Sequence, residues 1–244
     1  MKHTVKYGLL FGLSLGLTAL TAPAFAAYKE MQVADGGTIT GNVTFTGKDP
    51  APKTYTISKD TDVCGTGERV VDFVRVNDGA LADVVVYLDK VKQGKAFPAL
   101  GSQVEQKGCE FLPFLSVMHN KGDYAAINSD PVLHNIHTYE IIGRAKKTIF
   151  NISQPDVGTI NKTIKLKRGA GMKVECDAHD FMHAYVFVAK NPYYAVVAED
   201  GTFKIDNVPA GKYKIIAWHG SLKQQKGKVT VTANGETTID FNFK

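Results

Sequence analysis

The sequence lacks any long stretch with helical periodicity, and it contains only three cysteines and one tryptophan among 244 residues. No segment after residue 36 repeats apolar residues every 3.6 positions between two helix caps, which argues against a helical bundle. After residue 20, no apolar run approaches the roughly 20 residues that a membrane-spanning helix needs. The chain is therefore predicted to be rich in β-strands and to have no membrane span.

A large excess of one charge is also missing. The formal net charge is +5, and the first 26 residues hold two of the 29 basic residues and no acidic ones. The remainder then has 29 − 2 = 27 basic against 24 acidic residues, a formal +3. This balance is ordinary for a soluble protein, and it excludes nucleic acid as an expected partner.

The N-terminus has the features of a cleaved secretory signal. Two lysines come before an apolar run at positions 8–20, and the small residues Ala24 and Ala26 follow. Such an order predicts a signal peptide over residues 1–26 with cleavage after Ala26. No cysteine stands at the cleavage point for lipidation. The product is expected to be periplasmic or secreted, with 244 − 26 = 218 residues.

Short segments with alternating apolar and polar residues fill most of the chain after residue 36. They are bounded by Gly, Pro, Asn and Asp, as strands joined by turns are. Examples are "TITGNVTF", "DVVVYL", "HNIHTYEI", "AYVFVA", "KYKIIAW" and "KVTVTA". Many short strands at this spacing predict an all-β fold made of two antiparallel β-sandwiches.

Two distant parts of the chain look like pieces of one module. They are "GNVTFTG" (41–47) with "NDGALADVVVYL" (77–88), and "AEDGTFKIDNVPAGKYKIIAWHG" (198–220). Together they resemble the carboxypeptidase regulatory-like, or transthyretin-like, sandwich family. The resemblance implies a discontinuous outer sandwich over residues 27–100 and 192–244. Residues 101–191 would then form an inserted domain, which is topologically cheap when the insertion point is an exposed loop.

Three cysteines leave one without a disulfide partner in an oxidising compartment. One economical solution pairs Cys64 with Cys109 and leaves Cys176 to a metal. Cys176 stands in "VECDAHDFMHAYVF" (174–187), where Cys, His and Met recur at three-residue intervals. This stretch follows a strand whose alternation points the Cys176 sulfur into the sandwich interior.

Four candidate ligands come from the two ends of the predicted insert. His179 and Met182 follow Cys176 on a tight loop, and His134 begins a strand after the turn-rich "NSDP". Two imidazoles and a thiolate with a distant thioether are the ligands that a mononuclear copper site prefers, because soft sulfur favours Cu(I) and imidazole accepts both oxidation states. One type 1 copper ion is therefore the predicted cofactor.

At these residues the insert resembles the cupredoxin family, the blue copper proteins that include plastocyanin and amicyanin. The matching features are His134 with Asn135, and the later C-x-x-H-x-x-M motif. The resemblance implies a Greek-key cupredoxin sandwich. It also implies that Asn135 forms hydrogen bonds across to the loop that carries the cysteine.

Two other interpretations of these residues remain open. Without a metal, Cys176, His179 and Met182 would be ordinary core and loop residues. A structural zinc ion could instead use His134, Cys176 and His179 with His183, although zinc sites usually have paired Cys or His spacings at both ends. His137 is the first substitute if His134 is not the ligand.

The predicted copper site has no open position for a substrate, and catalytic metal sites keep one. The chain is therefore expected not to be an enzyme but an electron carrier. His179 would be the electron port, with Ala178 and Phe181 forming a small apolar docking patch. The family resemblance implies c-type cytochromes or a dehydrogenase as partners. The alternatives are a copper carrier or resistance protein, which the scattered methionines disfavour, and a structural or adhesive module.

Overall fold

The computed structural model describes Met1, residues 28–99 and residues 102–244. The predicted signal peptide therefore lies, apart from Met1, outside the described residues. In the described part the fold is all-β, and its one α-helix has four residues. Among the described residues there is no helix with the length and apolar character needed to cross a bilayer.

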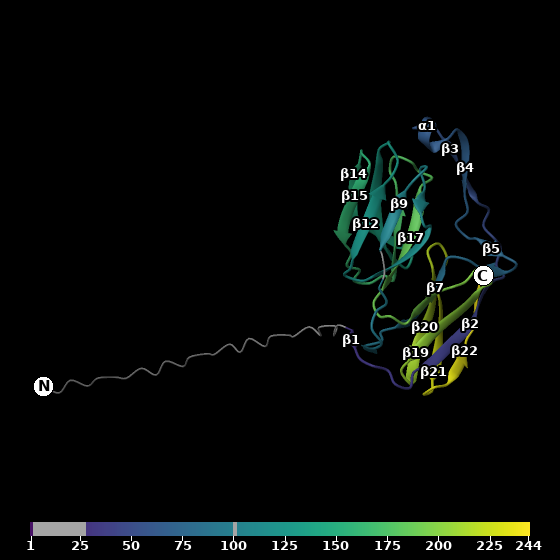
Figure 1. The fold of residues 1–244 in the computed structure, drawn as a ribbon, viewed down its shortest axis with the longest axis vertical. Coiled ribbons are helices and arrows are strands. Elements are labelled where there is room, and N and C mark those ends of the chain that lie inside the picture. The colour runs from purple at the N-terminus through teal and green to yellow at the C-terminus, as the bar shows by residue number, and fades with distance from the viewer. Residues whose placement is uncertain (2–27, 100–101) are drawn as a thin grey trace.

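The middle of the chain forms one sandwich of two sheets, drawn in teal and green in Figure 1. The first sheet contains, in spatial order, β10 (Phe111–Leu112), β9 (Gln103–Gln106), β12 (Asp123–Asn128) and β15 (Gly158–Thr163). The second contains β11 (Leu115–His119), β17 (His183–Ala189), β16 (Gly171–Glu175), β13 (His134–Ile142) and β14 (Ala145–Gln154). Their facing apolar side chains form one core. We refer to this body as the inserted sandwich.

The inserted sandwich is mostly antiparallel, but β9 pairs with β12 in parallel and β11 pairs with β17 in parallel. The structure thus has the expected antiparallel pairing in most of this sandwich, and these two pairs are the exceptions. The physical reason is that the chain switches sheets between β9, β11 and β12. No hairpin therefore joins β9 to β12 or β11 to β17, and the strands of these two pairs can run in the same direction.

The two ends of the described chain form the outer sandwich, which lies beside the inserted one in Figure 1. One sheet contains β18 (Tyr194–Val196), β7 (Val84–Asp89), β20 (Gly211–His219) and β21 (Gln225–Val231). The other contains β19 (Thr202–Val208), β2 (Gly37–Phe45), β6 (Ala80–Leu81) and β5 (Val76–Asn77), with β22 (Glu236–Thr238) and β23 (Phe241–Phe243) also paired to β2. A short parallel pair, β1 (Lys29–Glu30) and β8 (Gln93–Gly94), lies apart from these sheets. The strands of this outer sandwich come from residues 37–89 and 194–243, on either side of the inserted sandwich in the sequence.

One segment assigned to the outer sandwich packs elsewhere. The hairpin of β3 (Lys53–Ile57) and β4 (Gly67–Val71), with α1 (Thr61–Cys64) between them, extends alongside the inserted sandwich (Figure 1). Tyr55, Ile57 and Cys64 belong to the core of that sandwich. The structure contains the predicted disulfide between Cys64 and Cys109, so the hairpin is also joined covalently to the inserted sandwich. We call residues 53–71 the strap.

The two sandwiches contact each other through an aromatic cluster. Trp218 of the outer sandwich is almost fully buried, and its ring centroid is 5.8 Å from that of Phe187 in the inserted sandwich. A Cβ atom at Gly171 would lie 2.4 Å from the Trp218 ring, and one at Gly220 would lie 2.3 Å from the Tyr185 ring. The glycines are needed here because side chains would push the two bodies apart.

The burial of His219 is expected to make the free energy of unfolding depend on pH in the acid range. Burial, reinforced by the nearby positive charge of Arg75, lowers the pKa of His219 from 6.5 to about 4. Its Nδ1 accepts hydrogen bonds from the backbone N–H groups of Ser221 and Leu222, so the folded state holds the neutral ring. Between pH 6.5 and 4 the unfolded state binds more protons, and the free energy of unfolding therefore falls as the pH falls.

A His219→Asn variant does not titrate there. Between pH 6.5 and 4, its free energy of unfolding is expected to fall by about 3 kcal/mol less than that of the parent protein. Denaturant unfolding at a series of pH values measures this difference. If the free energy of unfolding changes equally with pH in the two proteins, the prediction that His219 titrates with a lowered pKa is wrong.

Candidate metal centre

The two segments predicted to carry ligands lie side by side. His134 begins β13, and Cys176 follows the last residue of β16. These strands are paired with His137 opposite Glu175, so the start of β13 adjoins the loop that joins β16 to β17. That loop folds back on itself, because the backbone N–H of Met182 donates to the carbonyl of His179 over 3.0 Å.

Three of the four predicted ligands meet at one buried point. Nδ1 of His134 lies 3.1 Å from Nδ1 of His179, and the Cys176 sulfur lies 3.8 Å from the same His179 atom. Within this group of three, each ligand atom is within 4.8 Å of the others. Their relative exposures are 0% for His134, 3% for Cys176 and 2% for His179. Met182 is buried in the same core cluster, and its role as a fourth ligand stays a prediction.

This arrangement suits a metal ion. The Nε2 atoms of His134 and His179 each lie 2.9 Å from a carboxylate oxygen, which can only accept a hydrogen bond. A ring that carries its proton at Nε2 turns the Nδ1 lone pair toward the other ring, and a cation between two such lone pairs would bind both. Ring nitrogens lie about 2.0 to 2.1 Å from a bound ion such as zinc. Two nitrogens 3.1 Å apart can therefore share one ion.

Burial also sets the protonation of the ligands. It raises the pKa of the Cys176 thiol, despite hydrogen bonds from backbone N–H groups that favour the thiolate. It lowers the pKa of His134, where the hydrogen bond to Asp130 acts in the opposite direction. A metal ion would bind the thiolate and the neutral imidazole, so loading the site should release the thiol proton.

Asn135 lies where the cupredoxin resemblance predicts it. Its side-chain oxygen accepts hydrogen bonds from the backbone N–H groups of Asp177 and Ala178. Its own backbone N–H points at the Cys176 sulfur over 3.4 Å. Asn135 therefore connects the start of β13 to the loop between β16 and β17 (residues 176–182), which we call the ligand loop, and contacts the cysteine in it.

Two carboxylates next to the site were missed at the level of sequence. Asp130 contacts His134, and burial, which alone would raise its pKa, is outweighed by hydrogen bonds from Cys109, His134 and Gly108, so the pKa lies below its usual value. Its position four residues before His134 in "NSDP" was a usable signal. Asp60 contacts His179 from 119 positions away, and no local pattern indicates it.

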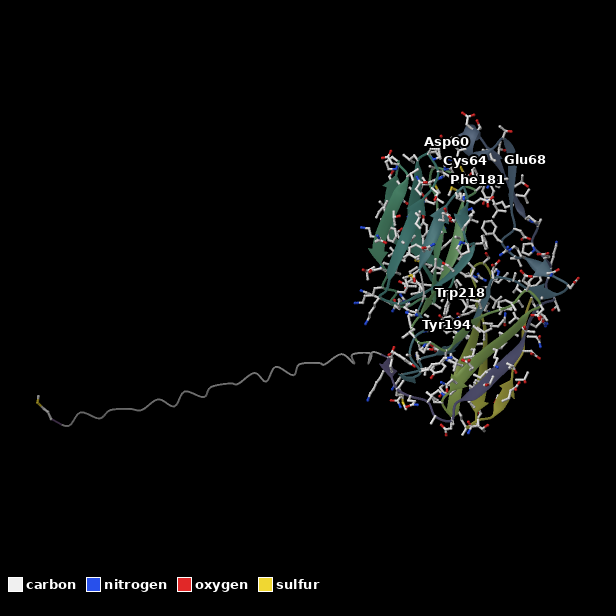
Figure 2. The ribbon with its side chains drawn as sticks, in the orientation of Figure 1. Asp60, Cys64, Glu68, Phe181, Tyr194 and Trp218 are labelled. Atoms are coloured by element: carbon white, nitrogen blue, oxygen red, sulfur yellow. A yellow bond between two sulfur atoms is a disulfide. The ribbon has the colours of Figure 1, made fainter. Side chains whose placement is uncertain are left out.

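The predicted docking patch is not exposed. We expected His179 to be an electron port ringed by Ala178 and Phe181, but Phe181 is 6% exposed, Ala178 is half-buried and His179 is covered. The reason is the strap: Asp60 contacts the His179 ring, and the Arg69 guanidinium lies 5.3 Å from the centre of the Phe181 ring. Figure 2 shows Asp60, Cys64 and Phe181 gathered at one end of the inserted sandwich.

His137, the substitute for His134, and His183, the fourth ligand of the zinc alternative, lie outside the cluster. His137 contacts Asp177 at 3.0 Å and stacks on Tyr139. His183 lies 3.0 Å from the Tyr55 hydroxyl, and its burial lowers its pKa to about 4. Among the described residues, neither completes a group with His134, Cys176 and His179. A four-ligand zinc site that includes His183 is therefore not assembled.

The fold and the site together define an all-β protein of two sandwiches with a buried His2Cys cluster. Residues 171–239, which are 69 of the 244, match the family model of polysaccharide lyase family 4, domain II. This match spans strands of both sandwiches and less than half of the chain. No curated protein sequence matches the chain.

Similar solved structures include copper proteins. A purple cupredoxin from Nitrosopumilus maritimus is 18% identical, with 36% of this chain and 100% of that chain covered and a TM-score of 0.30. Amicyanin from Paracoccus versutus is 15% identical, with 43% and 97% covered and a TM-score of 0.32. A Cu-containing nitrite reductase from Thermus scotoductus is 15% identical, with 39% and only 24% covered and a TM-score of 0.31. Because these scores are low, the function proposed below is based on the side-chain geometry.

Proposed function

We propose that the chain is an exported, non-enzymatic electron carrier that binds one type 1 copper ion through His134, Cys176, His179 and Met182. The observation that carries the proposal is the buried meeting of two imidazole nitrogens and one cysteine sulfur within 4.8 Å of one another. One thiolate with two imidazoles is the donor set that suits an ion alternating between Cu(I) and Cu(II).

Bound copper supplies one-electron chemistry by changing between these two oxidation states. The protein holds the ligands in one arrangement for both states. Cys176 lies in the loop after β16, His134 begins β13, and Asn135 ties the two segments together. Rigid ligands reorganise little when an electron arrives, and little reorganisation permits fast transfer.

The surroundings of the site favour an electron carrier over a carrier of copper ions. His134, Cys176 and His179 are almost fully buried, and the strap covers His179. An ion carrier must release its metal to a partner, which buried and covered ligands slow down. The proposed partners are periplasmic redox proteins, such as c-type cytochromes or a dehydrogenase.

The test is to express the chain from residue 27 onward, add one equivalent of Cu(II) and record the visible spectrum. A thiolate bound to Cu(II) gives an intense charge-transfer absorption, so a blue or purple protein is expected. The absorption should disappear on reduction and return on oxidation over repeated cycles. A wild-type protein that stays colourless with Cu(II) would overturn the proposal. Rapid loss of copper to a mild chelator would favour the copper-carrier alternative.

A further inference from the structure

In each candidate histidine ligand, the Nε2 atom, which lies on the far side of the ring from the cluster, is hydrogen-bonded to a carboxylate. His134 donates from Nε2 to Asp130, which lies on its own approach loop. His179 donates from Nε2 to Asp60, which lies on the strap. In metal sites, such outer hydrogen bonds select the tautomer of the ring and fix its orientation.

We propose that Asp60 is a positioning residue, delivered by the disulfide-anchored strap, that holds the His179 ring with Nδ1 turned toward Cys176 and strengthens Cu(II) binding there. The metal part of this inference rests on the function proposed above. The positioning part concerns this chain's own hydrogen bonds and holds with or without the ion.

The first support is the conformation of Asp60 itself. Asp60 is the N-cap residue of α1, where an aspartate side chain normally accepts a hydrogen bond from the first turn of its helix. Here it makes no such capping bond, and its Oδ2 lies 2.9 Å from Nε2 of His179 instead. Its φ of 49° places it in the left-handed region, whereas an N-cap residue normally has an extended backbone.

The second support is the fastening of the strap around Asp60. The backbone N–H of Cys64 donates to the Asp60 carbonyl over 2.8 Å, so the aspartate is one turn from the disulfide. Arg69 donates to the Cys64 carbonyl over 2.9 Å and to Glu110 of the inserted sandwich over 2.6 Å. These contacts fix the backbone of Asp60 relative to the ligand loop.

The third support is the exclusion of water. The His179 side chain is only 1% exposed, while the Asp60 side chain is 40% exposed. Asp60 therefore caps the ring at its solvent side, and water does not compete for Nε2. A negative carboxylate at this position stabilises the more positive Cu(II) over Cu(I), so it should lower the reduction potential of the site.

The experiment compares Asp60→Ala, Asp60→Asn and the matched control Asp62→Ala, all in the chain from residue 27 onward. Asp62 is an exposed carboxylate two positions along the same helix. Asp60→Ala is expected to weaken Cu(II) binding by roughly 10- to 100-fold. Asp60→Asn keeps an acceptor oxygen without the charge, so it should retain most of the affinity and raise the reduction potential. Asp62→Ala should change neither the affinity nor the potential.

A measurement on the metal-free protein separates positioning from copper binding. In 15N NMR spectra of the side chains, the Nε2 atom of wild-type His179 is expected to carry the proton that it donates to Asp60, and Asp60→Ala should lose this preference. If Asp60→Ala matches Asp62→Ala in copper affinity, potential and tautomer, the positioning role is refuted. If wild-type protein does not bind Cu(II) but the tautomer still depends on Asp60, the proposed function fails and the positioning role stands.

Discussion

A Cys176→Ser variant is expected to show no intense visible absorption after addition of Cu(II), while the wild type is coloured. The reason is that the absorption arises from charge transfer between a thiolate and Cu(II), and Cys176 is the cysteine that the disulfide leaves free. A hydroxyl is also a much poorer ligand for Cu(I) than a thiolate. The affinity for Cu(I) should therefore fall by more than the roughly 10- to 100-fold that follows loss of an outer hydrogen-bond partner.

A matched control separates loss of the ligand from loss of packing. Val174 is fully buried on β16 and lies two positions before Cys176. Val174→Ala removes packing but no ligand, so it should be less stable and still coloured. A Cys176→Ser protein with the wild-type spectrum would show that the thiolate does not bind the metal.

Removal of the disulfide is expected to have the largest effect on stability. The bond joins Cys64 to Cys109 across a separation of 45 residues. In the chain-entropy account, closing a loop of this length stabilises the folded state by about 4 kcal/mol. The double variant Cys64→Ala/Cys109→Ala should lose about that much free energy of unfolding, read from the denaturant transition of the inserted sandwich.

The same variant should also loosen the strap. Backbone amides in residues 53–71 are expected to exchange hydrogen faster, because the covalent link to the inserted sandwich is gone and only noncovalent contacts remain to hold them. Cys176→Ala in the metal-free protein is the control, since it truncates a buried cysteine without opening a loop. Equal losses of stability in the two variants would contradict a cross-linking role for the disulfide.

Much of the architecture was predictable because it depends on local patterns. Alternation in stretches such as 84–89 and 211–219 predicts strands, and the structure has β7 and β20 there. The C-x-x-H-x-x-M spacing is also a local pattern, and it predicts that Cys176 and His179 lie on one short loop. His134 was predictable from the residues around it, and its approach to that loop follows from the pairing of β13 with β16.

The strap shows where prediction from local pattern fails. Residues 53–71 alternate like any hairpin, and the alternation does not reveal which sandwich will bury Tyr55 and Ile57. The same holds for exposure: a histidine on a loop is expected to face solvent until another segment covers it. His179 was therefore predicted as an open electron port, and the structure buries it beneath Asp60.

The sequence by itself determined the strands and the spacing of the candidate ligands, because periodicity and spacing are properties of short stretches. The number of cysteines predicted that one would stay unpaired, and the structure shows that it is Cys176. Only the tertiary structure decided which carboxylates form hydrogen bonds with the candidate histidine ligands and which segment covers the site. The contact between Asp60 and His179 joins residues 119 positions apart, and it exists because long-range packing and one disulfide bring the strap to the ligand loop.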